Sequence, residues 1–214
     1  MNIVIIGGGD NFGKYAVNRF RDEGHRVKIL SHKNYGVIKD HLWANFNDVK
    51  DVIKNFNDLI EDIDHIDLLL YSSNVDRGPA AKEEFTSNAP LMAIERAWLD
   101  TLYVNTVVPH IISVLSLKKM TENSKIVFMT SGISLDISRD YCLTSAGHPG
   151  TKAAQNHLMY VLSLNNDKNV LVYSVSPHFP MENKEELEKI RNKVFENLKT
   201  FDRTLNSKIV NFWS

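Results

Sequence analysis

The sequence predicts an α/β protein: a Rossmann-like, doubly wound parallel sheet forming a single domain over residues 1–214. Short apolar runs recur along the chain, as in strands that are buried on both faces of a sheet. Stretches with apolar residues at helical spacing separate these runs, which predicts βαβ units with right-handed crossovers. The length of 214 residues and the 43% of hydrophobic residues fit one large core.

The first predicted unit is a strand, a glycine turn and a helix. Residues 3–6 are continuously apolar, residues 7–13 form a glycine-rich turn, and from Lys14 the apolar residues fall on one side of a helix. A helix N-terminus presents unpaired N–H groups and a partial positive charge, and glycine lets a diphosphate approach the backbone closely. The turn is therefore a candidate dinucleotide site, although a glycine cluster alone predicts an ordinary tight turn equally well.

The remaining elements alternate in the same way. Further strands are predicted at residues 26–30, 41–44, 67–71, 125–130, 169–175 and 208–213. Helices are predicted at residues 49–56, within 91–120, at 148–162 and at 187–198. Residues 47–48 can cap the first of these helices, and Asn183 with Glu186 resembles a capping box for the last. Pro109 lacks an N–H group, so we expect a kink that leaves the carbonyl of Asn105 without its helical partner.

Composition narrows the class of function. The 25 Lys and Arg nearly balance the 26 Asp and Glu, which favours a small-molecule partner over nucleic acid. Cys142 is the only cysteine, which excludes an internal disulfide and fits a reducing compartment. The sequence shows no signal-peptide core, no apolar run of membrane-spanning length and no metal-binding motif such as HExxH. We expect a cytoplasmic protein without a bound metal or membrane contact.

The end of the second predicted strand favours NADP(H) over NAD(H). An acidic residue there would hold the ribose 2′-hydroxyl, whereas a basic residue accommodates a 2′-phosphate. The sequence offers Ser31, His32 and Lys33, with no carboxylate before Asp40. NADP(H) is therefore the predicted cofactor and NAD(H) the alternative, unless Lys33 is an ordinary solvated loop charge.

Several segments follow a known order of motifs along nearly the whole chain. Gly7 and Gly13 occupy the first and last glycines of the pattern TGxxxGxG, with Asn11 at the middle glycine, and asparagine tolerates the left-handed backbone conformation. The other matches are Asn45 after the third strand, Ser72-Ser73-Asn74 after the fourth, the segment 98–105 ending in Asn105, Ser131, Lys152-Ala153-Ala154, and Pro177-His178. In this order they resemble the short-chain dehydrogenase/reductase family.

The resemblance implies roles for these positions. Its catalytic positions correspond to Asn105, Ser131, His148 and Lys152. In the family, the asparagine belongs to a proton relay and the serine orients the substrate oxygen. His148 stands at the position of the tyrosine that transfers the proton, and the lysine lowers the pKa of that tyrosine and holds the nicotinamide ribose. Its cofactor-binding positions correspond to Gly7, Gly8, Asn11, Phe12, Gly13, Ser31, His32, Lys33, Asn45, Ser72, Ser73, Asn74, Lys152 and Pro177. It also implies a homodimer or homotetramer built on the helices after Asn105 and Lys152.

The chain departs from the family at the chemistry, because His148 stands where the YxxxK motif has tyrosine. Lys152 is a like charge that disfavours an imidazolium, so we expect a weaker acid–base catalyst. Loss of a positioned acid costs about a hundred- to ten-thousandfold in rate. Ser131 and His148 are 17 positions apart, longer than in the family, so Tyr141 is a surrogate candidate and Ser134 a rival to Ser131.

These observations leave two main hypotheses. The first is an oxidoreductase that moves hydride between NADP(H) and a carbonyl or alcohol substrate. The second is a catalytically impaired relative that binds dinucleotide as a redox sensor or structural partner, which His148 and the short segment after Pro177 favour. A weaker third hypothesis is an interaction module that has lost the cofactor.

Overall fold

The computed structural model describes residues 1–9, 11–32, 40–76, 90–131, 147–177 and 183–212. These residues form a seven-stranded sheet of order β3-β2-β1-β4-β5-β6-β7 in which all neighbouring pairs are parallel. The strands are β1 (Asn2–Ile6), β2 (Arg26–Ser31), β3 (His41–Trp43), β4 (Leu68–Tyr71), β5 (Lys125–Met129), β6 (Leu171–Pro177) and β7 (Ile209–Phe212). The predicted doubly wound α/β fold is confirmed.

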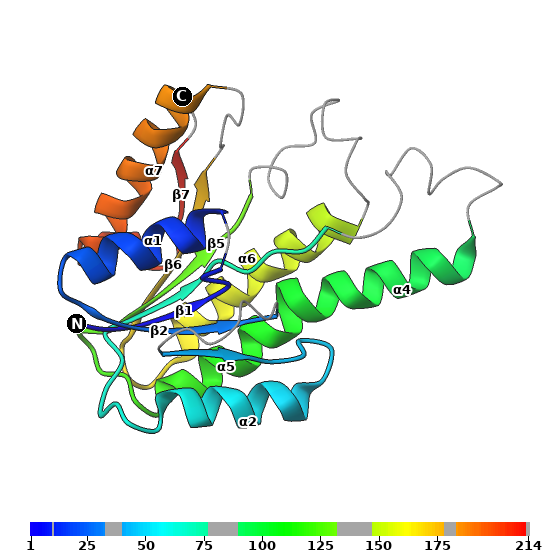
Figure 1. The fold of residues 1–214 in the computed structure, drawn as a ribbon, viewed down its shortest axis with the longest axis horizontal. Coiled ribbons are helices and arrows are strands. Elements are labelled where there is room, and N and C mark those ends of the chain that lie inside the picture. The colour runs from blue at the N-terminus through cyan, green and yellow to red at the C-terminus, as the bar shows by residue number, and fades with distance from the viewer. Residues whose placement is uncertain (10, 33–39, 77–89, 132–146, 178–182, 213–214) are drawn as a thin grey trace.

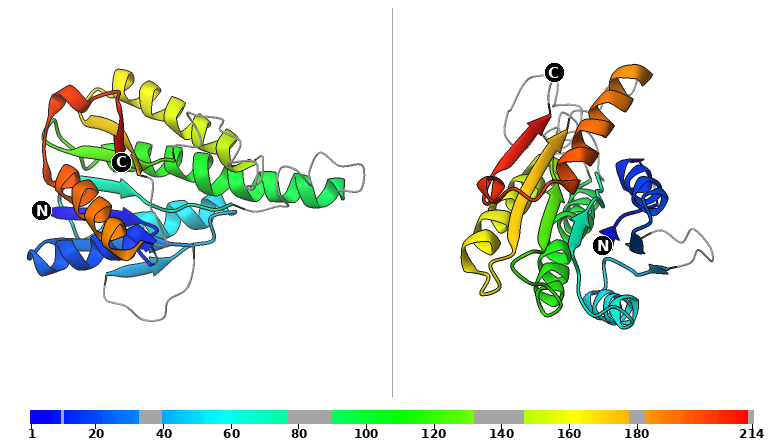
Figure 2. Two further views of the ribbon diagram at one scale, coloured as in Figure 1. Left: turned by 90° about the horizontal axis from the view of Figure 1, so that it is seen from above. Right: turned by 90° about the vertical axis from the view of Figure 1, so that its left-hand side faces the viewer.

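Helices cover both faces of the sheet (Figures 1 and 2). One face carries α1 (Asn11–Asp22) and α7 (Lys184–Lys199), and the other carries α2 (Val49–Ile60), α4 (Leu91–Leu102), α5 (Val108–Leu117) and α6 (Gly147–Asn165). Successive residues of β1 serve the two cores in turn: Ile3 and Ile5 pack toward α1 and α7, and Val4 and Ile6 toward the opposite layer. This two-sided burial explains why the strands are apolar without a break.

The start of α1 corrects the sequence-based prediction. The helix begins at Asn11 rather than Lys14, so the last residues of the glycine turn form its first turn. Phe12 is buried at helical spacing from Ala16, but it stands among the residues of the glycine pattern, which predict a turn. The earlier start brings the N-terminus of α1 close to the C-terminal end of β1, since only four residues separate the two elements.

The kink expected near Pro109 takes the form of a π-helix. Tyr103–Val107 winds as a π-helix between α4 and α5, and the N–H of Val108 bonds the carbonyl of Tyr103, five residues back. Pro109 then lies in the first turn of α5, where a missing N–H is tolerated. The helix therefore continues through this region with a wider turn that contains Asn105.

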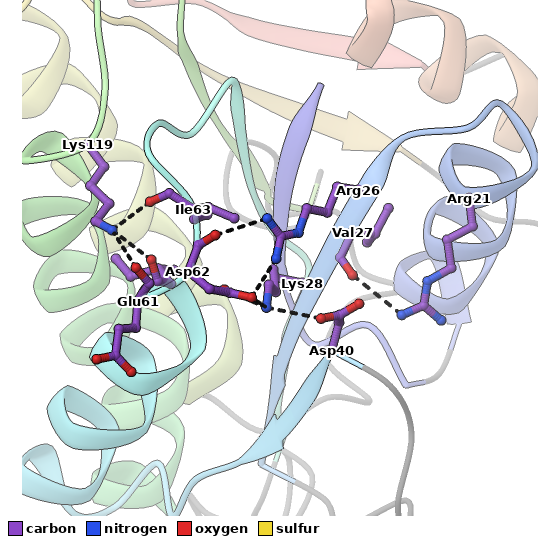
Figure 3. Close-up of polar contacts among 10 residues, drawn as sticks. Arg21, Arg26, Val27, Lys28, Asp40, Glu61, Asp62, Ile63 and Lys119 are labelled. Atoms are coloured by element: carbon purple, nitrogen blue, oxygen red, sulfur yellow. Dashed lines mark hydrogen bonds and ion pairs between the residues drawn. The ribbon is translucent and has the colours of Figure 1, made fainter.

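Capping groups fix the ends of two helices near the sheet. Asp48, rather than its neighbour Asn47, caps α2 by accepting from the N–H groups of Lys50 and Asp51 at 2.9 and 3.4 Å. At the other end of α2, Lys119 donates its Nζ–H groups to the carbonyls of Ile60, Glu61 and Ile63 (Figure 3). The predicted cap of α7 is confirmed, since Asn183 accepts from the N–H of Glu186 at 3.1 Å.

Candidate active site

A cleft of about 320 Å³ opens at the C-terminal ends of the central strands. It lies beside β1, where the strand order reverses between β1 and β4, and such switch points hold the ligands of open α/β sheets. Eight predicted site residues line it: Asn11, Phe12, Ser72, Asn74, Ser131, His148, Lys152 and Pro177. The structure thus brings three of the four predicted catalytic residues together with part of the predicted cofactor site.

The glycine turn is shaped so that larger residues cannot replace two of its members. Gly7 has φ of +86°, and a Cβ there would lie 2.5 Å from the backbone nitrogen of Ser73. A Cβ on Gly13 would lie 2.1 Å from the carbonyl oxygen of Gly7. Asn11 has φ of 46°, which confirms that this asparagine adopts the left-handed conformation in place of a glycine. The turn is therefore held close to β4 with the N-terminus of α1 beside the cleft.

Lys152 is a buried amine at the base of the cleft. Only 1% of the residue is exposed, and Nζ donates to the Met129 carbonyl at 2.9 Å and to Gln155 Oε1 at 3.1 Å. Burial lowers the pKa of Lys152 from 10.5 to about 7. The amine therefore changes its charge near neutral pH.

His148 lies one helical turn before Lys152 on α6, and 7% of it is exposed. Burial, and then the charge of Lys152, lower the pKa of His148 below 6.5, and Asp76 and the Val75 carbonyl oppose the shift. The like-charge effect agrees with the sequence prediction, but burial is the larger cause. The nitrogen Nδ1 lies 3.4 Å from the carbonyl oxygen of Val75. A carbonyl only accepts, so this geometry puts the proton of the neutral ring on Nδ1.

Asn105 lies behind the cleft rather than in its lining. It is fully buried, accepts from the Val75 N–H at 3.0 Å, and donates to the Val75 carbonyl at 2.8 Å and to Thr151 Oγ1 at 3.1 Å. Thr151 in turn donates to the His148 carbonyl at 3.1 Å. The amide of Asn105 thus holds the segment after β4 to the first turns of α6, which carry His148.

Ser31, His32 and Ser73, which were predicted to bind the cofactor, contact other residues of the chain. Ser31 is buried, with Oγ 2.6 Å from His41 Nε2. The ring of His32 lies against Phe46, and its Nδ1 is 3.2 Å from the hydroxyl of Ser73.

Asn45 and Gly8, two further predicted cofactor-binding positions, do not line the cleft. Asn45 is exposed and accepts from the N–H of Asn47 at 3.1 Å in a local turn. Gly8 faces a separate hollow between α1 and β2, together with Lys14 and Arg21.

Four predicted or alternative positions, Lys33, Ser134, Tyr141 and His178, lie outside the described residues. Within the described residues, no group of three or more His, Cys, Asp or Glu side chains is arranged to hold a metal ion. No helix in that part of the chain is long and apolar enough to cross a membrane.

Sequence reasoning missed two residues that line the cleft from α7, Leu187 and Arg191. Both residues lie in the helix predicted at residues 187–198, and neither was given a role in the site because many charged residues border the apolar stripe of this helix. Residues four apart lie on the same face of a helix, so Leu187 and Arg191 could have been assigned together to the cleft once α7 was known to pack beside α1.

No family model matches the chain, and no curated protein matches it. Solved structures match it along nearly its whole length. An oxidoreductase of the short-chain dehydrogenase/reductase family from Brucella ovis, in complex with a partially ordered NAD, is 17% identical over 98% of each chain, with a TM-score of 0.76. The chain has the fold of the short-chain dehydrogenases/reductases.

Two further structures of this fold match at similar levels. BdcA in complex with NADPH is 16% identical, with a TM-score of 0.74 over 98% of this chain and 91% of the other. A 4-hydroxyisoleucine dehydrogenase complexed with NADH is 16% identical, with a TM-score of 0.76 over 98% and 96%. The sequence-based resemblance is thereby confirmed at the level of the fold, and the structural neighbours include complexes with NAD and with NADPH.

Proposed function

We propose that the protein is an oxidoreductase of the short-chain dehydrogenase/reductase type that transfers hydride between NADP(H) and an alcohol or carbonyl substrate. The observation that supports this most strongly is the convergence of Ser131, His148 and Lys152 on the cleft that begins at the N-terminus of α1. Acid–base groups and a dinucleotide cradle in one cleft are what hydride transfer to a carbonyl requires.

The residues present fit a dinucleotide. Gly7 and Gly13 leave no room for a side chain at the turn, and Asn11 and Phe12 of the first turn of α1 line the cleft. Helix N–H groups at this place suit a diphosphate, and Pro177 and Ser131 lie at the strand ends farther along. A nicotinamide bound here supplies or accepts the hydride, and the protein has to position the substrate oxygen and move one proton.

His148 is proposed as the proton-transferring residue, and its tautomer favours one direction. With the proton on Nδ1 toward Val75, the nitrogen Nε2 of the neutral ring is an acceptor. An acceptor nitrogen takes a proton from an alcohol, whereas reduction of a carbonyl needs an imidazolium that the lowered pKa disfavours. We therefore propose alcohol oxidation as the faster direction at neutral pH.

Ser131 and Lys152 are proposed to assist. The hydroxyl of Ser131, at the end of β5, would orient the substrate oxygen. Lys152, held by Met129 and Gln155, would stabilise the cofactor ribose and take part in the proton balance with its pKa of about 7. Asn105 is proposed to act through its hold on Val75 and Thr151 rather than by touching substrate.

The preference for NADP(H) is supported by the position of the first carboxylate after β2. Asp40 Oδ1 pairs with the nearly buried amine of Lys28 at 3.0 Å, and Asp62 shares that amine (Figure 3). A carboxylate bound in this way is not available to hold a ribose 2′-hydroxyl.

A dinucleotide-binding sensor or structural partner without turnover is the second candidate. The observation that favours it is the low pKa of His148, which removes the proton donor that carbonyl reduction needs. Assays of the purified protein with panels of alcohols and carbonyls, which follow the amount of reduced nicotinamide, should distinguish the two candidates. His148→Phe and Tyr141→Phe should then be compared: loss in the first alone supports His148, and no change in either removes both assignments.

A homodimer or homotetramer in the cytoplasm remains a prediction. It is supported by large apolar side chains that are exposed on the outer faces of α5 and α6: Val114, Tyr160, Val161 and Leu164. Light scattering on dilute protein tests the assembly, and the mass of a single chain would contradict it.

A further inference from the structure

Arg191 lines the cleft from the middle of α7, on which sequence analysis placed no site residue. Its guanidinium carbon is 5.7 Å from the ring centroid of Tyr15 on α1, and Nη1 donates to Glu188 Oε1 at 2.8 Å. The side chain is 21% exposed. The described part of the chain offers the other guanidinium N–H groups no further acceptor, so they are free to bind a ligand in the cleft.

The contacts place Arg191 on the α1 side of the cleft. Tyr15 follows Phe12 by three residues on the same face of α1, and the two rings lie 5.8 Å apart. Phe12 itself lines the cleft at the helix N-terminus. His148 and Lys152 belong to α6, which packs on the opposite face of the sheet (Figure 2). Arg191 is thus grouped with the glycine turn rather than with the acid–base residues.

The part of the cleft between the N-terminus of α1 and Arg191 suits an anion for two independent reasons. The N-terminus of α1 carries a partial positive charge, and a held guanidinium adds a full one. Among the described residues that line the cleft, none is a carboxylate. The planar fork of an arginine matches phosphate oxygens in a two-point contact.

We propose that Arg191 binds the diphosphate of the nicotinamide dinucleotide beside the N-terminus of α1. The inference rests on the proposed function, since it takes the dinucleotide as the ligand of the cleft. An acidic group on the substrate is the other source of an anion, but the position of Arg191 beside Tyr15 and Phe12 favours the diphosphate.

The test is calorimetric titration of the full chain with NADPH, NADH and ADP-ribose. The variants are Arg191→Gln, Arg191→Lys and, as matched control, Arg19→Gln. Arg19 also lies beside Tyr15, but it is bound to the Tyr15 hydroxyl and to Asn192 and does not line the cleft. Arg191→Gln should lower the affinity for all three ligands by about ten- to hundredfold. Arg191→Lys should lower these affinities by less, and Arg19→Gln should change them little. Equal melting temperatures for wild type and Arg191→Gln would show that the fold is intact.

Three outcomes would overturn the proposal. Unchanged affinities in Arg191→Gln would remove it while leaving the proposed function in place. Equal losses in Arg191→Gln and Arg19→Gln would show a general charge effect. Unchanged nucleotide affinity with weaker binding of pyruvate to the NADPH complex would assign Arg191 to a substrate carboxylate. Failure of the wild type to bind any of the three nucleotides would instead contradict the proposed function itself.

Discussion

The side chain of Asn105 bonds both backbone groups of Val75, accepting from its N–H at 3.0 Å and donating to its carbonyl at 2.8 Å. The same carbonyl is 3.4 Å from Nδ1 of His148. One buried amide therefore fixes the segment after β4 and, through it, the orientation of the imidazole. The π-helix Tyr103–Val107 is the element that presents this amide to the segment.

Replacing Asn105 with alanine should destabilise the protein by about 2–4 kcal/mol, because two buried backbone groups of Val75 lose their partners. Urea unfolding of wild type and variant measures the difference. Asn55→Ala is the matched control, since Asn55 makes its hydrogen bonds within α2 to Asp51 and leaves no remote backbone group unpaired. Equal losses in the two variants would contradict the role given to Asn105.

Gly13→Ala should distort the turn, since its Cβ would lie 2.1 Å from the Gly7 carbonyl oxygen, which is backbone and cannot move aside cheaply. We expect a large loss of nucleotide affinity together with a lower melting temperature. Gly24→Ala is the control: its φ of +80° strains an alanine by about 1 kcal/mol, but no atom lies within 4 Å of the added Cβ. Normal nucleotide binding by Gly13→Ala would show that the tight turn is not needed.

Lys152 should make the free energy of unfolding rise with pH. Its pKa is about 7 in the folded protein and near 10.5 when unfolded, so between these values the unfolded state binds more protons. The slope from one such group is at most about 1.4 kcal/mol per pH unit. Lys125, with a pKa of about 8, adds a smaller rise above that pH.

Urea unfolding at several pH values between about 7 and 10 tests this expectation. Lys152→Met should remove most of the rise, and Lys125→Met should remove only the part above about pH 8. A pH dependence that is the same in wild type and Lys152→Met would contradict the buried, deprotonating amine.

Alcohol oxidation should depend on pH through His148. A base works only when unprotonated, and burial holds the pKa of His148 below 6.5, so the fall in kcat/KM that His148 causes should lie below that pH. His148→Phe should lower the rate by about a hundred- to ten-thousandfold and abolish this acidic limb. Persistence of the limb in His148→Phe would assign it to another group.

The sheet could be predicted from the sequence because its strands are buried on both faces. Residues such as Ile3–Ile6 leave little alternative to a strand in a parallel sheet. The first turn of α1 was not located in the same way, because Asn11 and Gly13 belong to a pattern that predicts a turn and Phe12 alone carries an apolar signal there. The π-helix was also hidden, since a single wide turn hardly changes the apolar pattern around Asn105.

The candidate site was predictable where side chains carry the chemistry. Ser131, His148 and Lys152 share a cleft as expected. The two hydrogen bonds between the Asn105 side chain and the backbone of Val75 were not predictable, because any residue possesses such backbone atoms. Arg191 was missed because an arginine on a charged helix is ordinarily solvated, and only the packing of α7 beside Tyr15 brings it to the cleft.

Calorimetric titration of the purified, nucleotide-free protein with NADPH and NADH tests the central claim most directly. We predict that both bind at one site per chain, NADPH more tightly, and that Gly13→Glu and Lys152→Ala weaken both while Gly24→Ala does not. Absence of binding by the wild-type protein to either nucleotide would contradict the enzyme and the sensor hypotheses together.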